Sequence, residues 1–472
     1  MNYNGEQAAL SRESRVTTHE GIIPGKVVSD VPGSPFRGGK AVLRSRVNRD
    51  DQKNMVEESW KILYDGKNAA RRRKADMRQK DHLKEELRAI QEELFEIRHD
   101  FHRHPELSGR EERTAQRIRA ELEKAGLSWR AVGGTGTLAE LQGRYPGPAV
   151  LLRADIDALP IRETGRCPFP SENDGVMHAC GHDIHMTALL GAVKVLAKRK
   201  NELHGSVRFV FQQAEEVGHG SEHFLREGVT DGALRIYGFH VCPDTPFGTA
   251  ILTDGTDAAS CDRMTIRVRG KGAHIAKPHL GRNAALAAAD IALHLSQLPS
   301  RHDPMENVLI GIGRIDAGHT WNVIPDCAEI EGTIRTLSMS ARARLLDEVR
   351  DAIQKTAALH GVSAETELEL QTPCLVNDTQ ACETMYGAAL QVLGDRSRII
   401  RKPVPFGFAG DDFAAYTEKI PGCFIHVGTA VAGEADTSVP LHSDNYYIHD
   451  EVIPIGSEIL IRCALAHLAE SK

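Results

Sequence analysis

Apolar residues recur along most of the chain with the spacing of either helices or strands. Between Leu83 and Phe101 they fall every three or four residues, which predicts an amphipathic helix laid on a domain surface. A second helix is expected over 111–125, because Gly126 follows it as glycine often follows a helix end. A third helix begins at His182 and carries its apolar residues on one face.

Three apolar runs in the first half of the chain read as strands, over 149–153, 207–211 and 234–239. Each run is followed by side chains that can bind a metal or a substrate, namely Asp155 and Asp157, then Glu215 and Glu216, then His240. In open α/β sheets, ligands bind outside the carboxyl ends of the strands. We therefore expect these side chains to meet at one sheet edge, together with the start of the helix at residue 182.

The pattern changes after residue 260 and changes back after residue 373. Between them the elements expected are a strand at 264–268, a helix at 283–298, strands at 307–315 and 327–336, a helix at 340–360 and a strand at 362–370. This β-α-β-β-α-β order is ferredoxin-like. Helix 379–393, strand 423–427 and a final helix then resume the first pattern.

The predicted fold class is α/β. A discontinuous catalytic α/β domain, with a mixed sheet and helices on both faces, spans 81–259 and 373–472. The inserted ferredoxin-like α+β domain spans 260–372 and is expected to act as a lid and dimerisation domain. Residues 1–80 contain few aromatics, two Pro-Gly breaks and a basic run over 71–74, which predicts a disordered or partly helical extension. A partner-binding or nucleic-acid-binding arm and a true start at Met77 are the alternatives for this segment.

Composition excludes some classes of protein. The 472 residues are 41% apolar and 26% charged, and the net charge of -7 argues against a nucleic-acid partner held by bulk electrostatics. Nine cysteines, odd in number and without a C-x-x-C pair, are typical of a reducing compartment. Neither a signal-peptide apolar region nor an 18-residue apolar run is present, so we expect a cytoplasmic protein without a membrane partner.

The stretch 177–185 holds the densest group of metal-capable side chains, His178, Cys180, His182, Asp183 and His185. A helix start lowers a thiol pKa, which favours the thiolate that binds metal. Further candidate ligands are His240, His442 and one of the pair Glu215–Glu216, since adjacent residues at a strand end point to opposite sides. Two metal ions activating a water, with a carboxylate that relays its proton, would suit amide hydrolysis. Taken singly, the stretch 177–185 fits a helix cap with ordinary histidines equally well. Glu215–Glu216 alone is better explained as a solvated acidic pair, and His240 and His442 alone as ordinary histidines.

Eight segments in a fixed order resemble the M20 metallopeptidase family, and within it the amidohydrolases of N-acyl amino acids, hippurate and auxin conjugates. The segments are 102–107, 153–160, 177–183, 211–216, 238–241, 270–274, 322–326 and 441–443. The resemblance runs from about residue 82 to the C-terminus.

The resemblance implies a role for each site residue. Cys180 would bridge two divalent metal ions (Zn, Mn, Co or Ni), and the remaining ligands would be His182, Glu216, His240 and His442. Glu215 would be the general base, and His274 would stabilise the oxyanion, commonly across a homodimer formed through the inserted domain. Asn322 and Arg335 would hold the substrate carboxylate, and Gly410 would contact the substrate. Asp155 and Asp157 are expected to orient ligand histidines or to cap the following turn.

The function expected is metal-dependent hydrolysis of the amide bond of an N-acyl amino acid or a related aromatic amide. The alternatives are hydrolysis of another C–N bond, as in N-carbamoyl amino acids or amino-aromatic compounds, and dipeptide cleavage. A non-enzymatic metal-binding protein is disfavoured because the base and all five ligands are present. Asp411 stands where relatives usually carry Glu, which leaves the substrate itself open.

Overall fold

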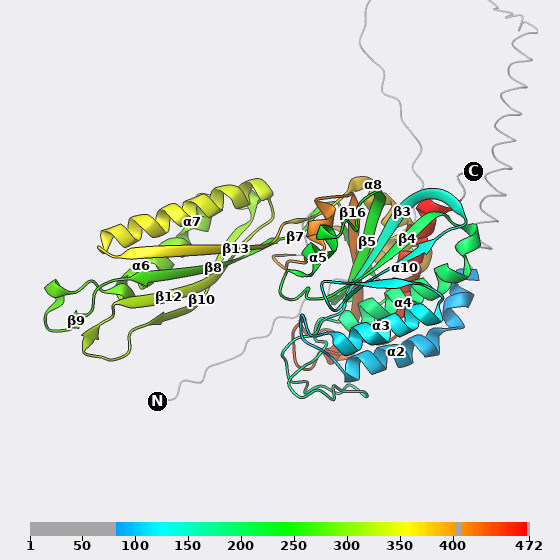
Figure 1. Ribbon diagram of the computed structural model, residues 1–472, viewed down its shortest axis with the longest axis horizontal. Helices are drawn as coiled ribbons and strands as arrows, with labels where there is room; N and C mark the ends of the chain where they lie inside the picture. Colours follow the sequence, from blue (N-terminus) through cyan, green and yellow to red (C-terminus); the bar gives the residue numbers. More distant parts are fainter. Residues whose placement is uncertain (1–81, 403–406, 470–472) are drawn as a thin grey trace, which may run out of the picture. The chain divides into compact units, whose positions relative to one another are not determined.

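The computed structural model describes residues 82–402 and 407–469, all of which lie within one compact unit (Figure 1). The extension predicted over 1–80 lies outside the described residues.

The larger domain is built on an eight-stranded sheet. Its order is β1 (Trp129–Val132), β2 (Gly136–Gln142), β4 (His204–Gln212), β3 (Tyr145–Asp155), β5 (Ala233–Pro246), β16 (Gly422–Ala430), β6 (Ala250–Thr253) and β15 (Ile399–Lys402). The central strands β4, β3, β5 and β16 are parallel, whereas β1, β2 and β4 form antiparallel pairs and β6 is antiparallel to β16. The sheet is therefore mixed, as predicted.

Both faces of this sheet are covered by helices. Side chains alternate along a strand, so Val150 and Leu152 of β3 belong to one core and Leu151 belongs to another. The first face carries α2 (Gln91–Arg103), α3 (Glu112–Lys124), α4 (His182–Lys198), α8 (Thr379–Leu393) and α10 (Val452–Leu468). The second carries the short helices α5 (Gly220–Arg226) and α9 (Ala414–Thr417). This confirms the predicted fold class of the larger domain.

Two predicted helices differ in detail. The helix expected between Leu83 and Phe101 is interrupted: residues 82–88 form one helix and α2 follows after a turn at 89–90. There the Ile90 amide donates to the Leu87 carbonyl, the tighter i→i+3 bond of a helix end. Helix α4 is buried on nearly all sides, rather than on one apolar face, because α2, α10 and the sheet surround it.

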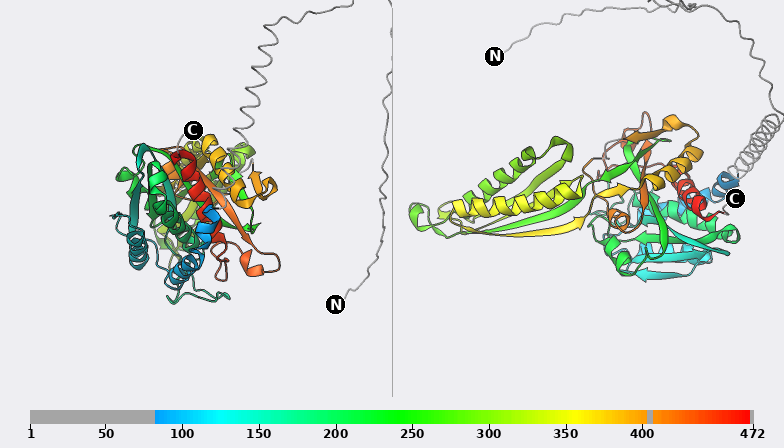
Figure 2. Two further views of the ribbon diagram at one scale, coloured as in Figure 1. Left: turned by 90° about the vertical axis from the view of Figure 1, so that its right-hand side faces the viewer. Right: turned by 90° about the horizontal axis from the view of Figure 1, so that it is seen from above.

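The inserted domain is a four-stranded antiparallel sheet with two helices on one face (Figures 1 and 2). The strand order is β10 (Val308–Ala317), β12 (Cys327–Thr336), β8 (Ser260–Arg269) and β13 (Ser363–Thr372). Helices α6 (Ala284–Gln297) and α7 (Met339–Leu359) enclose its core. In chain order this is the predicted β-α-β-β-α-β arrangement. We propose 81–259, 260–372 and 373–472 as the domain limits.

Short strands escaped prediction because two to four residues carry no measurable periodicity. Strands β7 (Gly255–Ala258) and β14 (Leu375–Asn377) pair where the chain enters and leaves the inserted domain. Strands β9 (Ala273–His274) and β11 (Val323–Ile324) form a ribbon. Because β8 starts at the larger domain and β9 follows its other end, this ribbon lies at the far tip of the inserted domain (Figure 1).

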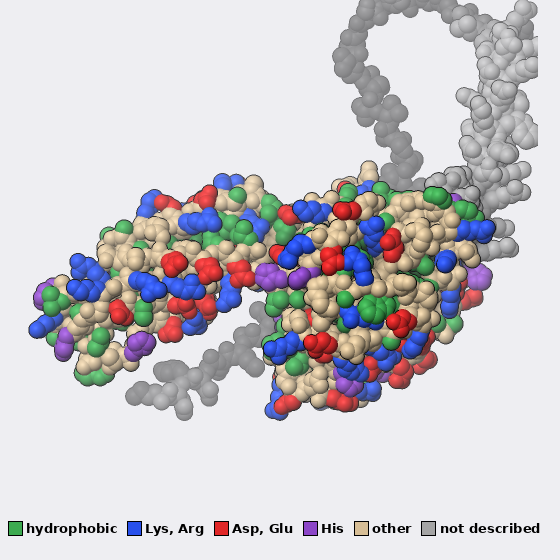
Figure 3. Space-filling model, in the orientation of Figure 1, with side chains coloured by type: hydrophobic (Ala, Val, Ile, Leu, Met, Phe, Trp, Pro, Cys, Tyr) green, Lys and Arg blue, Asp and Glu red, His purple; other side chains and the backbone are tan. Residues whose placement is uncertain are grey.

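Charged side chains of both signs are interspersed on the face seen in Figure 3. Within the described ranges, no helix combines the length and the apolar composition needed to cross a membrane. The cytoplasmic location stays a prediction.

Candidate active site

The polar residues expected at the ends of the parallel strands meet beside the start of α4. Asp155 ends β3 and Glu215 follows β4, but β5 continues past His240 to Pro246, so His240 lies within a strand. A cavity of about 240 Å³ opens there. Among the predicted site residues, those that line it are Cys180, Glu215, Glu216, His240, Arg335, Gly410 and His442. His182 is fully buried beside this cavity.

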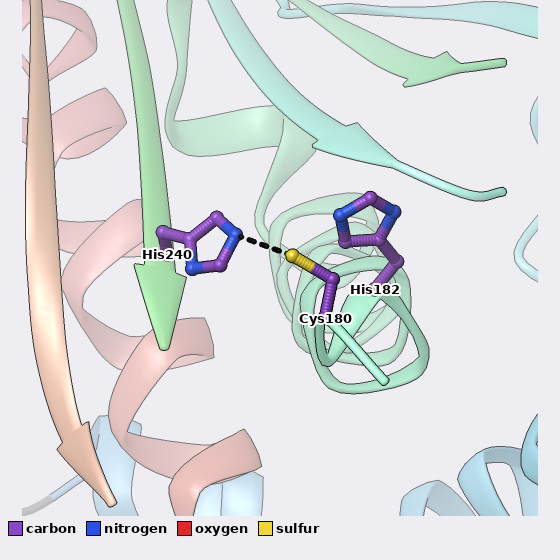
Figure 4. A group of neighbouring side chains, drawn as sticks. All are labelled: Cys180, His182 and His240. Carbon is purple, nitrogen blue, oxygen red and sulfur yellow. Dashed lines mark hydrogen bonds between the residues drawn. The ribbon is translucent and has the colours of Figure 1, made fainter. Parts of the chain in front are cut away.

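The five predicted metal ligands lie within reach of one another. Cys180 Sγ is 3.4 Å from His240 Nε2 (Figure 4). Glu216 Oε1 lies 3.8 Å from His182 Nε2 and 3.5 Å from His442 Nε2. Within each of two overlapping groups, Cys180–His182–His240 and Cys180–Glu216–His442, the donor atoms lie within 4.8 Å of one another. Cys180 belongs to both groups, so its Sγ lies close to the donor atoms of each.

The histidine rings are oriented so that Nε2 faces the cluster. His182 Nδ1 lies 3.0 Å from the Asp157 carbonyl and 3.2 Å from Asp157 Oδ1, and His240 Nδ1 lies 2.7 Å from the Val241 carbonyl. Donation of the Nδ1 proton to these oxygens leaves the Nε2 lone pair for a metal. Within the described residues, His182 Nε2 and Glu216 Oε1 are buried without a hydrogen-bond partner. Buried polar atoms rarely lack a partner, so these two atoms are suited to bind a metal ion.

The electrostatics of the cluster favour cations. Burial opposes a charge on His182, yet Asp155, Asp157 and Glu216 outweigh burial and raise its pKa to about 10. Burial, together with Glu216 and Glu215, raises the pKa of the Cys180 thiol well above its usual value. The helix start therefore does not lower this thiol pKa by itself, contrary to the expectation from sequence. Bound cations would reverse that shift.

The two glutamates are held at a strained strand end. Ala214 has a positive φ of 55°, which non-glycine residues seldom adopt, and its amide donates to Glu111 Oε1 at 2.9 Å. The Glu216 amide donates to Asp157 Oδ2 at 3.0 Å. Asp157 thus fixes both the His182 ring and the backbone that carries Glu215 and Glu216, the orienting role expected for it.

Two predicted residues lie away from this cluster. His274 lies in the ribbon at the tip of the inserted domain, and Asn322 directly precedes the ribbon strand β11; the Ile275 amide donates to the Asn322 carbonyl at 3.1 Å. Arg335, by contrast, reaches the cavity wall, and its guanidinium donates to the Phe408 carbonyl at 2.7 Å. One chain therefore assembles the proposed ligands and base without His274 and Asn322.

Sequence reasoning gave no role to several buried groups near the site. Arg153 is fully buried and pairs with Asp155 and Asp412, both at 2.7 Å. Asp155 accepts a hydrogen bond from His185 Nδ1 at 2.7 Å, whereas its other oxygen lies 3.8 Å from His182 Nε2. Asp155 therefore orients His185 rather than His182. The pair Asp257–His426 in the cavity wall was also missed. Its members come from distant segments, and no local pattern links them.

Comparisons with known proteins agree with this geometry. Residues 151–466 match the model of peptidase family M20/M25/M40. N-acetylcysteine deacetylase of Bacillus subtilis is 37% identical over 82% of this chain and 99% of its own length. IAA-amino acid hydrolase ILR1-like 2 of Arabidopsis thaliana is 34% identical over 80% of this chain and 85% of its own.

A solved structure of similar fold is that of the Bacillus subtilis YXEP protein, described as a dinuclear metal-binding peptidase of the M20 family. It superposes with a TM-score of 0.68 at 36% identity, covering 80% of this chain and 98% of that one. With the family match spanning residues 151–466, these findings establish that the chain belongs to peptidase family M20/M25/M40.

Proposed function

We propose that this family member is a dinuclear metal-dependent amidohydrolase that cleaves the amide bond of an N-acyl amino acid or a related aromatic amide. The observation that carries the proposal is the convergence of five ligand-type side chains, with buried unsatisfied donor atoms, beside Glu215 in one cavity. The relatives named above, a deacetylase and an amino acid conjugate hydrolase, support an acylated amino compound as substrate.

Two divalent ions would be held by the cluster around Cys180. The thiolate of Cys180 would bridge them, and the other ligands would be His182, Glu216, His240 and His442. This mixture of thiolate, imidazole and carboxylate suits Zn, Mn, Co or Ni. When bound, the ions polarise a carbonyl and acidify a water molecule.

Glu215 would move the proton. It lines the cavity beside Glu216, and its Oε1 accepts from the Asp412 amide at 3.4 Å. Burial and the nearby carboxylates of Asp411 and Glu216 raise its pKa well above the usual value, so Glu215 is a group that can accept and hold a proton. It takes the proton of the attacking water and passes it to the leaving nitrogen.

Arg335 and Gly410 would position the substrate. The planar guanidinium of Arg335 at the cavity wall can bind a substrate carboxylate through two parallel hydrogen bonds. A Cβ at Gly410 would lie 3.2 Å from Thr372 Oγ1 and 3.3 Å from Cys261 Cβ, so a side chain there would crowd the cavity wall. Arg335 belongs to the inserted domain and Gly410 to the C-terminal part of the larger domain.

A hydrolysis screen tests the proposed reaction. The metal-loaded protein is offered N-acetyl, N-benzoyl and indole-acetyl amino acids, with N-carbamoyl amino acids, amino-aromatic acids and dipeptides as competitors. We expect release of the free amino acid from at least one acyl series, with the highest kcat/KM in the panel. Activity confined to the carbamoyl, amino-aromatic or dipeptide substrates would favour the corresponding alternative reaction.

We also propose that His274 and Asn322 act in the site of a second copy in a homodimer. Their place at the tip of the inserted domain keeps both residues out of the cavity of their own chain. Loss of such a group typically lowers kcat by roughly 10²–10³.

A complementation experiment tests this arrangement. His274→Ala and Glu215→Gln each inactivate the homodimer, but mixed dimers contain one site with both residues intact. Unfolding and refolding the two variants together should therefore restore roughly a quarter of the native activity, by random pairing in a symmetric dimer. Mixed dimers that are detected by mass spectrometry yet stay inactive would show that His274 does not serve its partner's site.

A further inference from the structure

The cavity wall contains a hydrogen-bonded pair of side chains to which the proposed mechanism gives no role. His426 Nε2 donates to Asp257 Oδ2 at 2.7 Å. Asp257 is fully buried, His426 is 5% exposed, and both line the cavity that holds Cys180 and His240. The pair therefore borders the cavity that would receive a substrate.

The sheet places His426 next to the proposed metal ligands. Strands β16 and β5 are parallel neighbours, and their register sets His426 beside His240 and Phe424 beside Gly238. Neighbouring strands lie about 4.8 Å apart. A group that rests against His426 is thus only a few atoms from a scissile amide bound at His240.

A local irregularity directs Asp257 toward the same wall. In the pairing of β7 with β14, Ala258 lies opposite Leu375 and Thr256 lies opposite Val376, so Asp257 is the extra residue of a β-bulge. Bulges redirect a side chain and are frequent beside active sites. Asp257 Oδ2 binds His426, whereas Oδ1 has no hydrogen-bond partner among the described residues.

Ala258, Leu375 and Phe424, which belong to one apolar cluster, also line this cavity. Asp257 Oδ1 is thus a buried carboxylate oxygen that accepts no hydrogen bond from the described residues and lies near hydrocarbon side chains. A bound ligand could supply the missing hydrogen-bond donor. An acceptor of this kind selects an N–H or O–H group and disfavours a hydrocarbon end in the same place.

We propose that Asp257 and His426 form a subsite that recognises a hydrogen-bond donor, an amino or hydroxyl group, carried by the substrate close to its scissile amide. Asp257 accepts from that group, and His426 holds the carboxylate in place. The proposal rests on the amidohydrolase function and narrows its substrates to amino- or hydroxyl-bearing acyl amino acids, such as aminobenzoyl or hydroxybenzoyl conjugates.

Matched substrates and an isosteric variant test the subsite. For the native enzyme, kcat/KM should be at least about tenfold higher for an amino- or hydroxybenzoyl amino acid than for the benzoyl parent, assayed at each ring position. In Asp257→Asn, the amide oxygen can still accept from His426, so the NH₂ group faces the cavity and replaces an acceptor by a donor. The preference should then fall at least about tenfold, while metal content stays at the native level.

Asp254→Asn is the matched control. It makes the same charge change three residues earlier, at an exposed side chain that accepts from Thr379 at 3.1 Å outside the cavity, and should leave the preference unchanged. If Asp257→Asn does not fold, the subsite is tested instead by inhibition of the native enzyme with the free benzoic acids. Aminobenzoates or hydroxybenzoates must then inhibit at least about tenfold more strongly than benzoate.

The outcomes separate the subsite from the function. Hydrolysis of benzoyl and substituted benzoyl conjugates at equal kcat/KM, or a preference that survives in Asp257→Asn, overturns the subsite and leaves the amidohydrolase function in place. Failure of the native enzyme to hydrolyse any acyl amino acid overturns both. Equal inhibition by substituted and parent acids counts against the subsite alone.

Discussion

Glu215→Gln should abolish turnover, lowering kcat by roughly 10²–10⁴, the usual contribution of a general acid–base group. Glutamine has the same size but cannot take the proton of the attacking water or deliver it to the leaving nitrogen. Glu215 is not among the five proposed ligands, so metal content should stay close to native. Steady-state kinetics on the best substrate of the screen and elemental analysis of the same preparation give both quantities.

Glu222→Gln is the matched control for this prediction. It makes the same change at an exposed position of α5, where the carboxylate pairs with Arg226 at 2.8 Å. The control should keep native kcat and KM. If Glu215→Gln kept substantial activity, the base would have to be another group, and Asp411, which also lines the cavity, would be the first to test.

Cys180→Ala should lose metal and activity together. Its Sγ is the donor atom common to both overlapping ligand groups, so its removal weakens both proposed ion positions at once. Chelated native protein should regain activity when Zn, Mn, Co or Ni is added back, and the most effective ion identifies the productive metal. Chelated Cys180→Ala should regain none.

Cys327→Ala, at an exposed cysteine of the inserted domain, is the control for thiol loss. It should bind metal and recover as the native protein does. Metal content is measured by elemental analysis after gel filtration. Full metal occupancy in Cys180→Ala would show that Cys180 does not bridge the ions and that its side chain only lines the cavity.

The strongest sequence signals concerned elements that are long and periodic. The strands that lead to Asp155, Glu215 and His240 were predicted from their apolar runs. The polar residues at the ends of those runs then predicted a ligand site at a parallel sheet edge. Helix α4 was predicted, but its complete burial was not, because periodicity in one segment does not reveal what packs on its other faces.

Local sequence patterns could not predict contacts between distant segments of the chain. The roles of His442 and Arg335 came from resemblance to a family, since nothing near them in sequence marks a site. The pairing of Asp257 with His426 depends on a bulge and on the register of β16, and neither feature has a signal in the flanking residues. The position of His274 at a tip likewise follows from the length of β8 and the short ribbon after it.

The place of β16 in the large sheet has a consequence for biosynthesis. This strand comes from the last part of the chain, yet it lies between β5 and β6, which are made before the inserted domain. On the ribosome, both neighbours therefore wait with unpaired backbone edges until translation passes the insertion, and His442 emerges later still. Nascent chains arrested before β16 should be prone to aggregation and, without His442, unable to retain the proposed cations, which would then be loaded after translation.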